Sequence, residues 1–279
     1  MSEIQTCFKR YEKKYLITKE QYREMIRGMM SYMKPDKHPV YSVNNIYYDT
    51  DNFDLIRTSL EKPVYKEKLR MRSYGIPKNG DTVFVELKKK FDGVVYKRRI
   101  TMEVQDAVRY LAGLGKGDGN QISREIDYFR KLYNPSPKVL ISYDREAYSA
   151  ADGSELRITF DTALRARSYD LDLRLGTYGM LFPTEDICLM EIKIPGAAPL
   201  WLAKLLSENG IFSTSFSKYG TYYTQFILGK YGTYYPQFNL SKDGTHYKQS
   251  ILSKDGTHYT QSVLCGESSI LSKEVNLSA

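Results

Sequence analysis

One segment of this sequence places a cation at every second position. Lys68, Arg70 and Arg72 alternate with Leu69 and Met71, and residues two apart lie on the same face of a β-strand. Guanidinium groups bind phosphate oxygens in pairs, and lysine ammonium groups supply point charges. The segment therefore predicts a strand with one apolar face and one phosphate-binding face.

The same alternation returns in other segments, where carboxylates stand among the cations. The pattern Glu-x-Lys occurs at Glu86 and Lys88 and again at Glu191 and Lys193. Strand spacing also groups Lys97 with Arg99, Tyr143 with Arg145, and Arg157 with Thr159 and Asp161. Carboxylates select hard cations such as Mg²⁺ or Mn²⁺. Cations and a metal ion suit phosphoryl transfer, which requires positioning and charge neutralisation.

A half-buried sheet with a solvated outer face is the simpler interpretation of any one of these strands. Taken together, however, rows of Arg and Lys on one sheet face would repel one another unless an anion lay among them. A closed antiparallel barrel satisfies both demands, because the charged faces then line a lumen and no sheet edge remains. We therefore predict an α+β fold, a closed antiparallel β-barrel with helices packed outside.

The elements expected to build this barrel follow from hydrophobic periodicity. A capping box at Thr18–Gln21 starts a helix over 19–33, which Pro35 ends. The turn Phe91-Asp92-Gly93 joins two strands as a hairpin, and the glycine-rich stretch 113–120 reads as a flexible connection. Strands are predicted at 43–50, 64–75, 82–90, 94–102, 138–148, 154–161 and 187–196, and further helices at about 103–113, 122–133 and 198–209.

Composition narrows the class of protein. The 279 residues are enough for a large core, and the formal net charge of +8 suits either a polyanionic partner or a lysine-rich soluble surface. Three cysteines and three histidines argue against a disulfide framework, a zinc site and a histidine base. Without an apolar run or a signal peptide, the chain is predicted to be cytoplasmic, with no membrane span.

The C-terminal part repeats itself. Near-copies of SKYGTYYTQFIL recur every 12 residues from Ser217 to Leu264. We predict that residues 229–279 form a weakly structured tail left by duplication, although a small β-array is the alternative. The first copy, with Ser217 and Lys218, is assigned to the preceding domain. That domain therefore spans 1–228, and the later equivalents Lys230, Lys242 and Lys254 are echoes of Lys218.

Residues 6–228 resemble the triphosphate tunnel metalloenzymes, and within them the polyphosphate polymerase domain of the vacuolar transporter chaperone (VTC) complex and its bacterial relatives. The motifs RYEKKY, KLRMRSYG, VFVELKKK, VYKRRI, SYDREAY, ELRITFD, MEIKIPG and FSKYG carry this resemblance, in the family's order. Hydrolytic tunnel enzymes typically begin with Glu-x-Glu-x-Lys. Here Arg10-x-Glu12-x-Lys14 has a cation first, which favours a lumen that grips a long polyanion.

The resemblance implies a stand-alone, bacterial-type enzyme that transfers the γ-phosphoryl group of ATP to polyphosphate and releases ADP, with Mn²⁺ or Mg²⁺. ATP and polyphosphate are the expected partners, and nucleic acid is not. The catalytic residues it implies are Lys14, Arg70, Arg72, Lys88, Arg145, Arg157, Lys193 and Lys218. Supporting phosphate contacts fall on Arg10, Lys68, Lys97, Arg99, Tyr143 and Ser217. Glu191 would hold the metal, with Glu86 or Glu12 either as a second carboxylate or as partners that orient basic side chains.

Two other functions stay open on the sequence. A tunnel enzyme that hydrolyses triphosphate or short polyphosphate would use the same fold and metal, with water as the acceptor. A non-catalytic binder of polyphosphate or another polyanion would need the cations but would have little use for Glu191.

Overall fold

The computed structural model describes residues 11–92, 94–182 and 187–229, and the backbone of 237–240, 246–252 and 258–264. The chain divides into two compact units, Met1–Tyr219 and Gly220–Ala279. The functional boundary predicted near Leu228 stays a prediction. Among the described residues, no helix combines the length and the apolar character that crossing a membrane requires.

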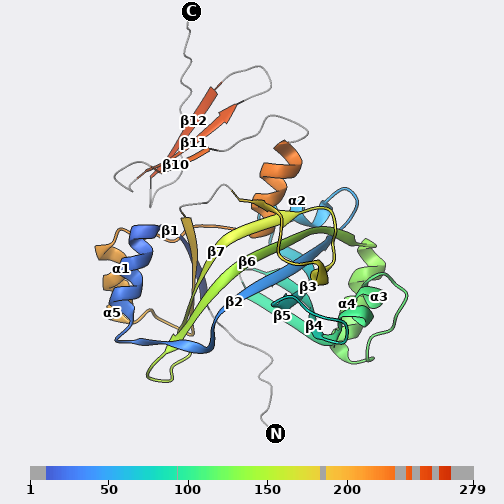
Figure 1. Cartoon of the computed structure of the whole chain (residues 1–279). Helices are drawn as coiled ribbons and strands as arrows, with labels where there is room; N and C mark the ends of the chain where they lie inside the picture. Colours follow the sequence, from blue (N-terminus) through green and yellow to red (C-terminus); the bar gives the residue numbers. More distant parts are fainter. Residues whose placement is uncertain are drawn as a thin grey trace, which may run out of the picture. The chain divides into compact units, whose positions relative to one another are not determined.

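The first unit is built on one nine-stranded antiparallel sheet (Figure 1). From one edge to the other its strands are β1 (Tyr11–Thr18), β9 (Ile187–Ile194), β7 (Arg157–Arg167), β6 (Ser136–Ala150), β2 (Met33–Asp49), β3 (Tyr65–Tyr74), β4 (Thr82–Phe91) and β5 (Val94–Glu103). The short strand β8 (Met180–Leu181) pairs with β7 off this path. The β4–β5 hairpin turns where the sequence predicts it, at Asp92, whose φ is +42°.

The prediction of a closed barrel is wrong. Strands β1 and β5 lie at opposite ends of the strand order and do not pair with each other. The backbone of Lys14 on β1 instead pairs with Thr214, whose nitrogen lies 2.7 Å from the Lys14 carbonyl oxygen. Residues 214–219, an irregular stretch and the first two residues of helix α6 (Lys218–Tyr222), thus approach the edge of β1 at Lys14. We call residues 214–219 the seam segment.

Helices cover the apolar face of the sheet in two groups. Helix α1 (Lys19–Met29) lies beside α5 (Leu200–Glu208), and their side chains join those of β1, β7 and β9 in one core. Helices α3 (Val104–Leu111) and α4 (Gln121–Tyr133) cover β2 to β5 in a second core. Because both cores occupy the same face, the opposite face of the sheet is left to the charged residues.

Several helices and strands have bounds that differ from those predicted from the sequence. The capping box at Thr18 is present, as predicted, but α1 ends at Met29 and Pro35 lies in β2. Strand β2 runs for 17 residues, beyond the predicted 43–50, because β6 pairs with it almost throughout.

Helix α2 (Asp54–Leu60) was not predicted from the sequence. The carboxylate that accepts hydrogen bonds from its first-turn amides belongs to Asp49, at the end of β2. The 3₁₀ turn η1 (Leu173–Leu175) was also not predicted.

Helix α6 (Lys218–Tyr222) spans the boundary between the two units, and the π-helical segment η2 (Tyr223–Leu228) follows it. In the second unit, β10 (Gln237–Leu240), β11 (His246–Leu252) and β12 (His258–Leu264) pair antiparallel in chain order. Lys230, Lys242 and Lys254 lie outside the described residues. The role of the repeats therefore stays a prediction.

Candidate functional site

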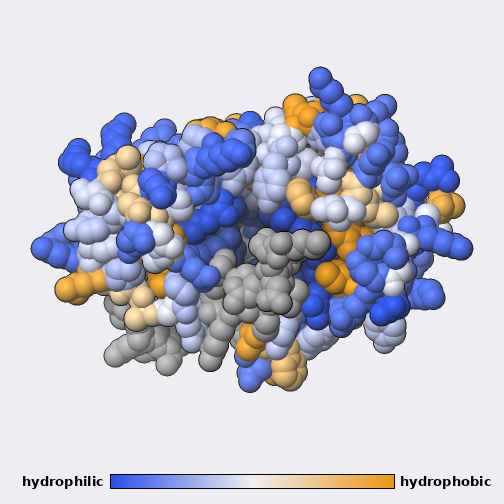
Figure 2. All heavy atoms as spheres, turned by 90° about the horizontal axis from the view of Figure 1, so that it is seen from below, coloured by the Kyte–Doolittle hydropathy of each residue, from blue (hydrophilic) through white to orange (hydrophobic). Residues whose placement is uncertain are grey.

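The register of the sheet aligns the predicted cations in rows on one face. Lys68 on β3 pairs with Lys88 on β4, which pairs with Lys97 on β5. The basic face, as we call it, presents Lys14, Lys68, Arg70, Arg72, Lys88, Lys97, Arg99, Arg145, Arg157, Lys193 and Lys218. Figure 2 shows one side of the molecule hollowed at its middle, with hydrophilic residues around the hollow.

The sheet is curled so that its two halves face each other across this surface. Glu12 lies on β1 and Lys88 on β4, strands far apart in the sheet order. Burial acts to raise the pKa of Glu12, yet the nearby Lys88 ammonium leads the charges that lower it below its ordinary value. The charged faces of separate strands therefore act on one common space.

One buried carboxylate, Glu86, anchors the cations at the β3–β5 end. Its side chain is 1% exposed and lies 2.7 Å from Arg70 Nη2 and 2.9 Å from Lys97 Nζ. It also accepts from Arg99 Nε at 2.7 Å, and Arg72 lies 3.9 Å away. Burial alone would raise the pKa of Glu86, but these four cations hold it well below the usual range. Glu86 therefore orients the cations around it.

Two carboxylates, Asp161 and Glu191, anchor the opposite end. Arg145 donates to both oxygens of Asp161, at 2.5 and 2.7 Å, and to Glu191 at 3.1 Å. Lys218 Nζ lies 2.6 Å from Asp161 and 3.4 Å from Glu191, and Lys14 lies 3.6 Å from Glu191. Burial acts to raise the pKa of Glu191, but Lys218, Lys14 and Arg145 hold it far below its ordinary value.

Three lysines of the basic face are less fully neutralised than its other cations, although the Glu12 carboxylate acts on Lys88 and Lys193 without contacting them. Within the described part of the chain, Lys68, Lys88 and Lys193 have no ion pair, and Lys68 donates only to Ser217 Oγ, at 3.2 Å. Burial lowers the pKa of Lys68 to about 7, and Lys88 adds to that effect. Burial likewise lowers the pKa of Lys88 and of Lys193. Partly buried, unpaired ammonium groups are costly unless an anion joins them.

Aromatic and amide side chains hold the cations in place. Tyr143 lies under Lys218, whose Nζ is 4.3 Å from the ring centroid. Arg72 donates to the Tyr143 hydroxyl at 3.4 Å and to Asn45 Oδ1 at 2.7 Å. Tyr47 accepts from Arg70 at 3.3 Å. The guanidinium groups therefore present their remaining N–H groups in fixed directions, as bidentate phosphate binding requires.

The seam segment brings its own residues to the basic face. Lys14 Nζ donates to the Phe216 carbonyl at 3.0 Å, and Lys68 donates to Ser217. The next residue, Lys218, is 8% exposed. Burial would lower its pKa, but Asp161 and Glu191 raise it, so that Lys218 remains charged. The Tyr219 hydroxyl, 2.9 Å from Asp49, secures the end of the segment.

The structure brings almost all of the predicted residues together. Arg157 lies on the same face but pairs with Asp36 at 2.7 Å, at the end of the row. Arg10 is outside the described residues. The sequence did not single out Asp161, Asn45 or Tyr47 as parts of the site. Of these three, only Asp161 could have been assigned to the site from the sequence, because strand spacing places it on the same face as Arg157.

The carboxylates define what metal the site could hold. Glu12 and Glu191 lie on paired strands, and Lys14 lies between them, 3.8 and 3.6 Å from their oxygens. Within the described residues, no group of three or more His, Cys, Asp or Glu could enclose a metal ion. Glu12 and Glu191 are the carboxylates of the site that could contribute oxygen ligands to a hard cation such as Mg²⁺, which typically uses one or two protein carboxylates.

A comparison with protein families identifies the family of this chain. The family model described as "VTC domain" matches residues 9–227. The chain therefore belongs to the VTC domain family, which confirms the resemblance found in the sequence. Subunit 4 of the vacuolar transporter chaperone complex of Schizosaccharomyces pombe is 24% identical over 222 residues, 64% of this chain and 31% of that protein. The chain thus spans about a third of the relative's length.

Solved structures also show a distant likeness. A candidate adenylate cyclase from Bacillus halodurans aligns with a TM-score of 0.47 and 16% identity, over 74% of this chain and 92% of that one. The PH1819 protein of Pyrococcus horikoshii aligns with a TM-score of 0.38 and 17% identity, over 79% and 97%. Likenesses this distant do not bear on function.

Proposed function

We propose that this protein transfers the γ-phosphoryl group of ATP to the end of an inorganic polyphosphate chain and releases ADP. The observation that carries the proposal is the set of three lysines, Lys68, Lys88 and Lys193, that have no ion pair in the described structure. Within the described structure, the carboxylates that contact the other cations, Glu86, Asp161 and Glu191, form no ion pair with these three lysines. A ligand with many closely spaced negative charges would neutralise them, and membership of the VTC domain family supports this class of substrate.

The proposed step is a displacement at phosphorus. A terminal oxygen of the polymer attacks the γ-phosphorus of ATP and forms a new P–O bond. The bond from that phosphorus to the β,γ-bridging oxygen breaks, and its electron pair leaves with ADP. The cations of the basic face bind both phosphate chains, bring the reacting ends together and neutralise the charge that develops on the oxygens.

A metal ion completes this proposal. Glu191 would hold Mg²⁺ or Mn²⁺, with Glu12 as the second carboxylate, and the bound ion would neutralise charge on the phosphates. Glu86 is less suited to this task, because Arg70 and Lys97 lie 2.7 and 2.9 Å from it. The cations beside Glu191 lie 3.1 to 3.6 Å away and leave its oxygens more accessible. Lys14, which contacts both Glu12 and Glu191, would keep the two carboxylates apart and oriented.

The direct test is incubation of the full chain with ATP and Mn²⁺ or Mg²⁺, followed by gel separation of the products. Long polymer together with ADP is the expected result. Orthophosphate as the sole new phosphate product would overturn the proposal and show a hydrolase with the same fold. Retained polyphosphate binding without turnover, with either metal, would show a non-catalytic binder.

The role of Glu191 is tested separately. Glu191→Gln keeps the shape of the side chain but removes its charge, so we expect turnover to fall at least a hundredfold, with weaker dependence on metal concentration. Glu20→Gln, on the exposed surface of α1, is the matched control and should leave turnover unchanged. Full activity of Glu191→Gln would show that the metal assignment is wrong.

A further inference from the structure

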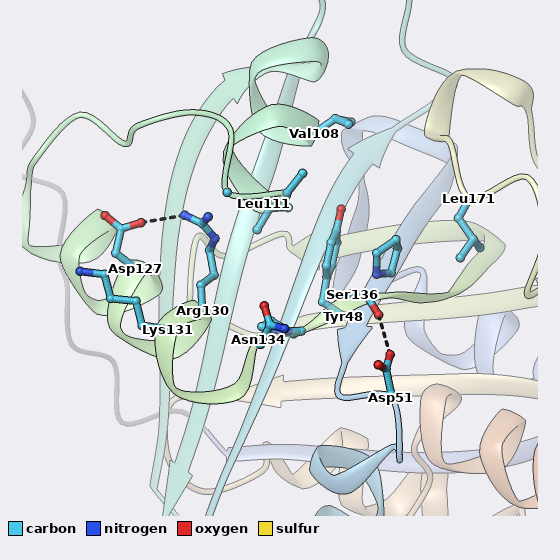
Figure 3. Close-up of a pocket in the computed structure, with 14 residues that line it drawn as sticks. Tyr48, Asp51, Val108, Leu111, Asp127, Arg130, Lys131, Asn134, Ser136 and Leu171 are labelled. Atoms are coloured by element: carbon cyan, nitrogen blue, oxygen red, sulfur yellow. Dashed lines mark hydrogen bonds and ion pairs between the residues drawn. The ribbon is translucent and has the colours of Figure 1, made fainter.

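A second candidate site lies on the other side of the sheet. A cavity of about 580 Å³ lies between the end of β2, helices α3 and α4 and the start of β6 (Figure 3). Tyr48 lines it, whereas the preceding residue, Tyr47, bonds Arg70 on the basic face. The cavity therefore lies behind the site described above. Its volume falls in the range of small-molecule sites, roughly 300–1,000 Å³.

Part of the cavity wall is apolar and offers no hydrogen-bond donor. Val108 and Leu111 from α3 and Leu171 lie around it, as Figure 3 shows. Pro135 and Pro137 at the start of β6 also contribute, and proline has no backbone N–H. A flat apolar ring fits against such walls better than a hydrated ion does.

One hydroxyl donor faces the cavity. Tyr48 is 6% exposed as a whole residue, its hydroxyl makes no hydrogen bond within the described part of the chain, and the oxygen is accessible from the cavity. In Figure 3 its ring rises from β2 and its oxygen points toward α3, between Leu111 and Leu171. Burial raises the pKa of Tyr48, so the group stays protonated and able to donate. A ligand acceptor in the cavity would therefore meet an unoccupied donor, and the bond would become buried when the ligand binds.

A matching acceptor lies at the end of α3. The last four carbonyls of a helix lack intrahelical partners. Here the backbone nitrogens of residues 112–114 cap the carbonyls of residues 108–110. The carbonyl of Leu111, a lining residue, accepts no hydrogen bond from the described residues. The lining of the cavity thus includes one hydroxyl donor at Tyr48 and one backbone carbonyl without a capping partner at Leu111, beside the apolar side chains.

The charges at the cavity largely cancel. Asp127 accepts from Arg130 at 3.0 Å, and Asp51 accepts from Lys138 at 2.6 Å. Lys131, on the exposed side of α4, has no ion pair within the described part of the chain. The interior therefore suits an uncharged group, while the rim offers one ammonium for an anionic substituent.

We propose that this cavity binds a nucleoside or nucleotide, separately from the basic face. The base would lie between Val108, Leu111 and Leu171, accept from Tyr48 and donate to the Leu111 carbonyl. A 5′-phosphate, where present, would extend to Lys131. The inference does not depend on the proposed phosphotransfer, because it uses none of the residues of the basic face.

Adenosine is the sharpest probe, since it has no phosphate for the basic face to bind. Equilibrium dialysis of radiolabelled adenosine against the full chain should show saturable binding at one site, and excess tripolyphosphate should not displace it. Tyr48→Phe removes only the hydroxyl and should weaken binding about tenfold, the usual worth of one buried hydrogen bond. Tyr128→Phe, on the exposed part of α4, should bind as the wild type does.

A second variant keeps the test independent of Tyr48. Val108 is 39% exposed, so Val108→Trp fills the cavity mouth without replacing a core residue and should abolish adenosine binding. Three results would each overturn the proposal: no saturable binding up to millimolar adenosine, undiminished binding by both Tyr48→Phe and Val108→Trp, or displacement by tripolyphosphate. None of these results bears on polymer synthesis, which is measured separately.

Discussion

Lys218 and Asp161 form a buried ion pair, with the ammonium nitrogen 2.6 Å from Oδ2. The two residues come from the seam segment and from the middle of β7, so this contact ties the seam segment to the sheet. Asp161 also holds Arg145. One carboxylate therefore positions a cation from each of two separate parts of the chain.

Replacing Lys218 should damage the site more than the fold. Lys218→Met keeps much of the side-chain length but leaves Asp161 and Glu191 with one cation fewer. We expect turnover with ATP to fall at least tenfold and polyphosphate binding to weaken, because a charge-assisted contact is lost. Steady-state kinetics check this, with Lys204→Met on the exposed surface of α5 as control. Unchanged kinetics in Lys218→Met would remove Lys218 from the site.

Truncation locates the end of the working domain. A chain that ends at Leu228 retains the seam segment and should keep its activity, whereas a chain that ends at Phe216 loses Lys218 and should be inactive. The product gel described above measures both. Loss of activity in the longer truncation, with its secondary structure intact by circular dichroism, would give the repeats a necessary role.

Polyphosphate binding should depend on pH through Lys68. Its pKa is lowered to about 7 in the ligand-free fold, from 10.5 in the unfolded chain. Between these values the unfolded chain binds more protons, so this residue favours the ligand-free fold increasingly as pH rises. A bound anion favours the charged lysine and draws a proton back. Affinity should therefore be highest below pH 7 and fall above it, by up to tenfold per pH unit.

Calorimetric titration with long-chain polyphosphate from pH 6 to pH 9 measures this effect. Lys68→Met should bind more weakly below pH 7 and show a shallower dependence on pH. Lys97, whose pKa burial lowers to about 8, titrates nearby, and Lys97→Met separates its contribution. An identical slope in the wild type and in Lys68→Met would rule out Lys68 as the titrating group.

Glu86 should matter for stability as well as for binding. Glu86→Gln leaves Arg70, Lys97 and Arg99 without their shared carboxylate, and loss of one partner from a buried ion pair costs about 3–5 kcal/mol. Urea denaturation should show a free energy of unfolding lower by roughly this amount. Glu103→Gln, exposed at the end of β5, should change it by less than about 0.5 kcal/mol.

Arg167 should be a second stability determinant, remote from the basic face. It is 2% exposed and donates to the carbonyls of Asp170, Asp172, Gly176 and Tyr178. Arg167→Ala should lower the free energy of unfolding by about 3 kcal/mol or more. Arg174→Ala removes a partly exposed ion pair and should cost less than about 1 kcal/mol. Equal melting temperatures for the two variants would contradict this.

Strand alternation predicted the charged face because it depends only on local spacing, and Lys68, Arg70 and Arg72 do lie on one side of β3. The segment that borders the β1 edge of the sheet could not be predicted in the same way. Whether β1 meets β5 or the seam segment depends on a contact between Lys14 and Thr214, residues far apart in sequence. The cavity at Tyr48 was equally hidden, since two adjacent tyrosines give no sign of which one lacks a hydrogen-bond partner.

The seam segment changes how a long guest could reach the basic face. Opening a closed barrel severs the hydrogen bonds along an entire pair of strands. The seam segment, by contrast, meets β1 at one isolated backbone bridge, at Thr214, and its other described contacts are made by side chains, among them Lys14, Lys68, Asp161 and Asp49. The edge of the sheet at β1 is therefore bordered by a separate segment and is not sealed by pairing with another strand of the sheet. A polymer could be laid in from the side, without threading a free end through the molecule.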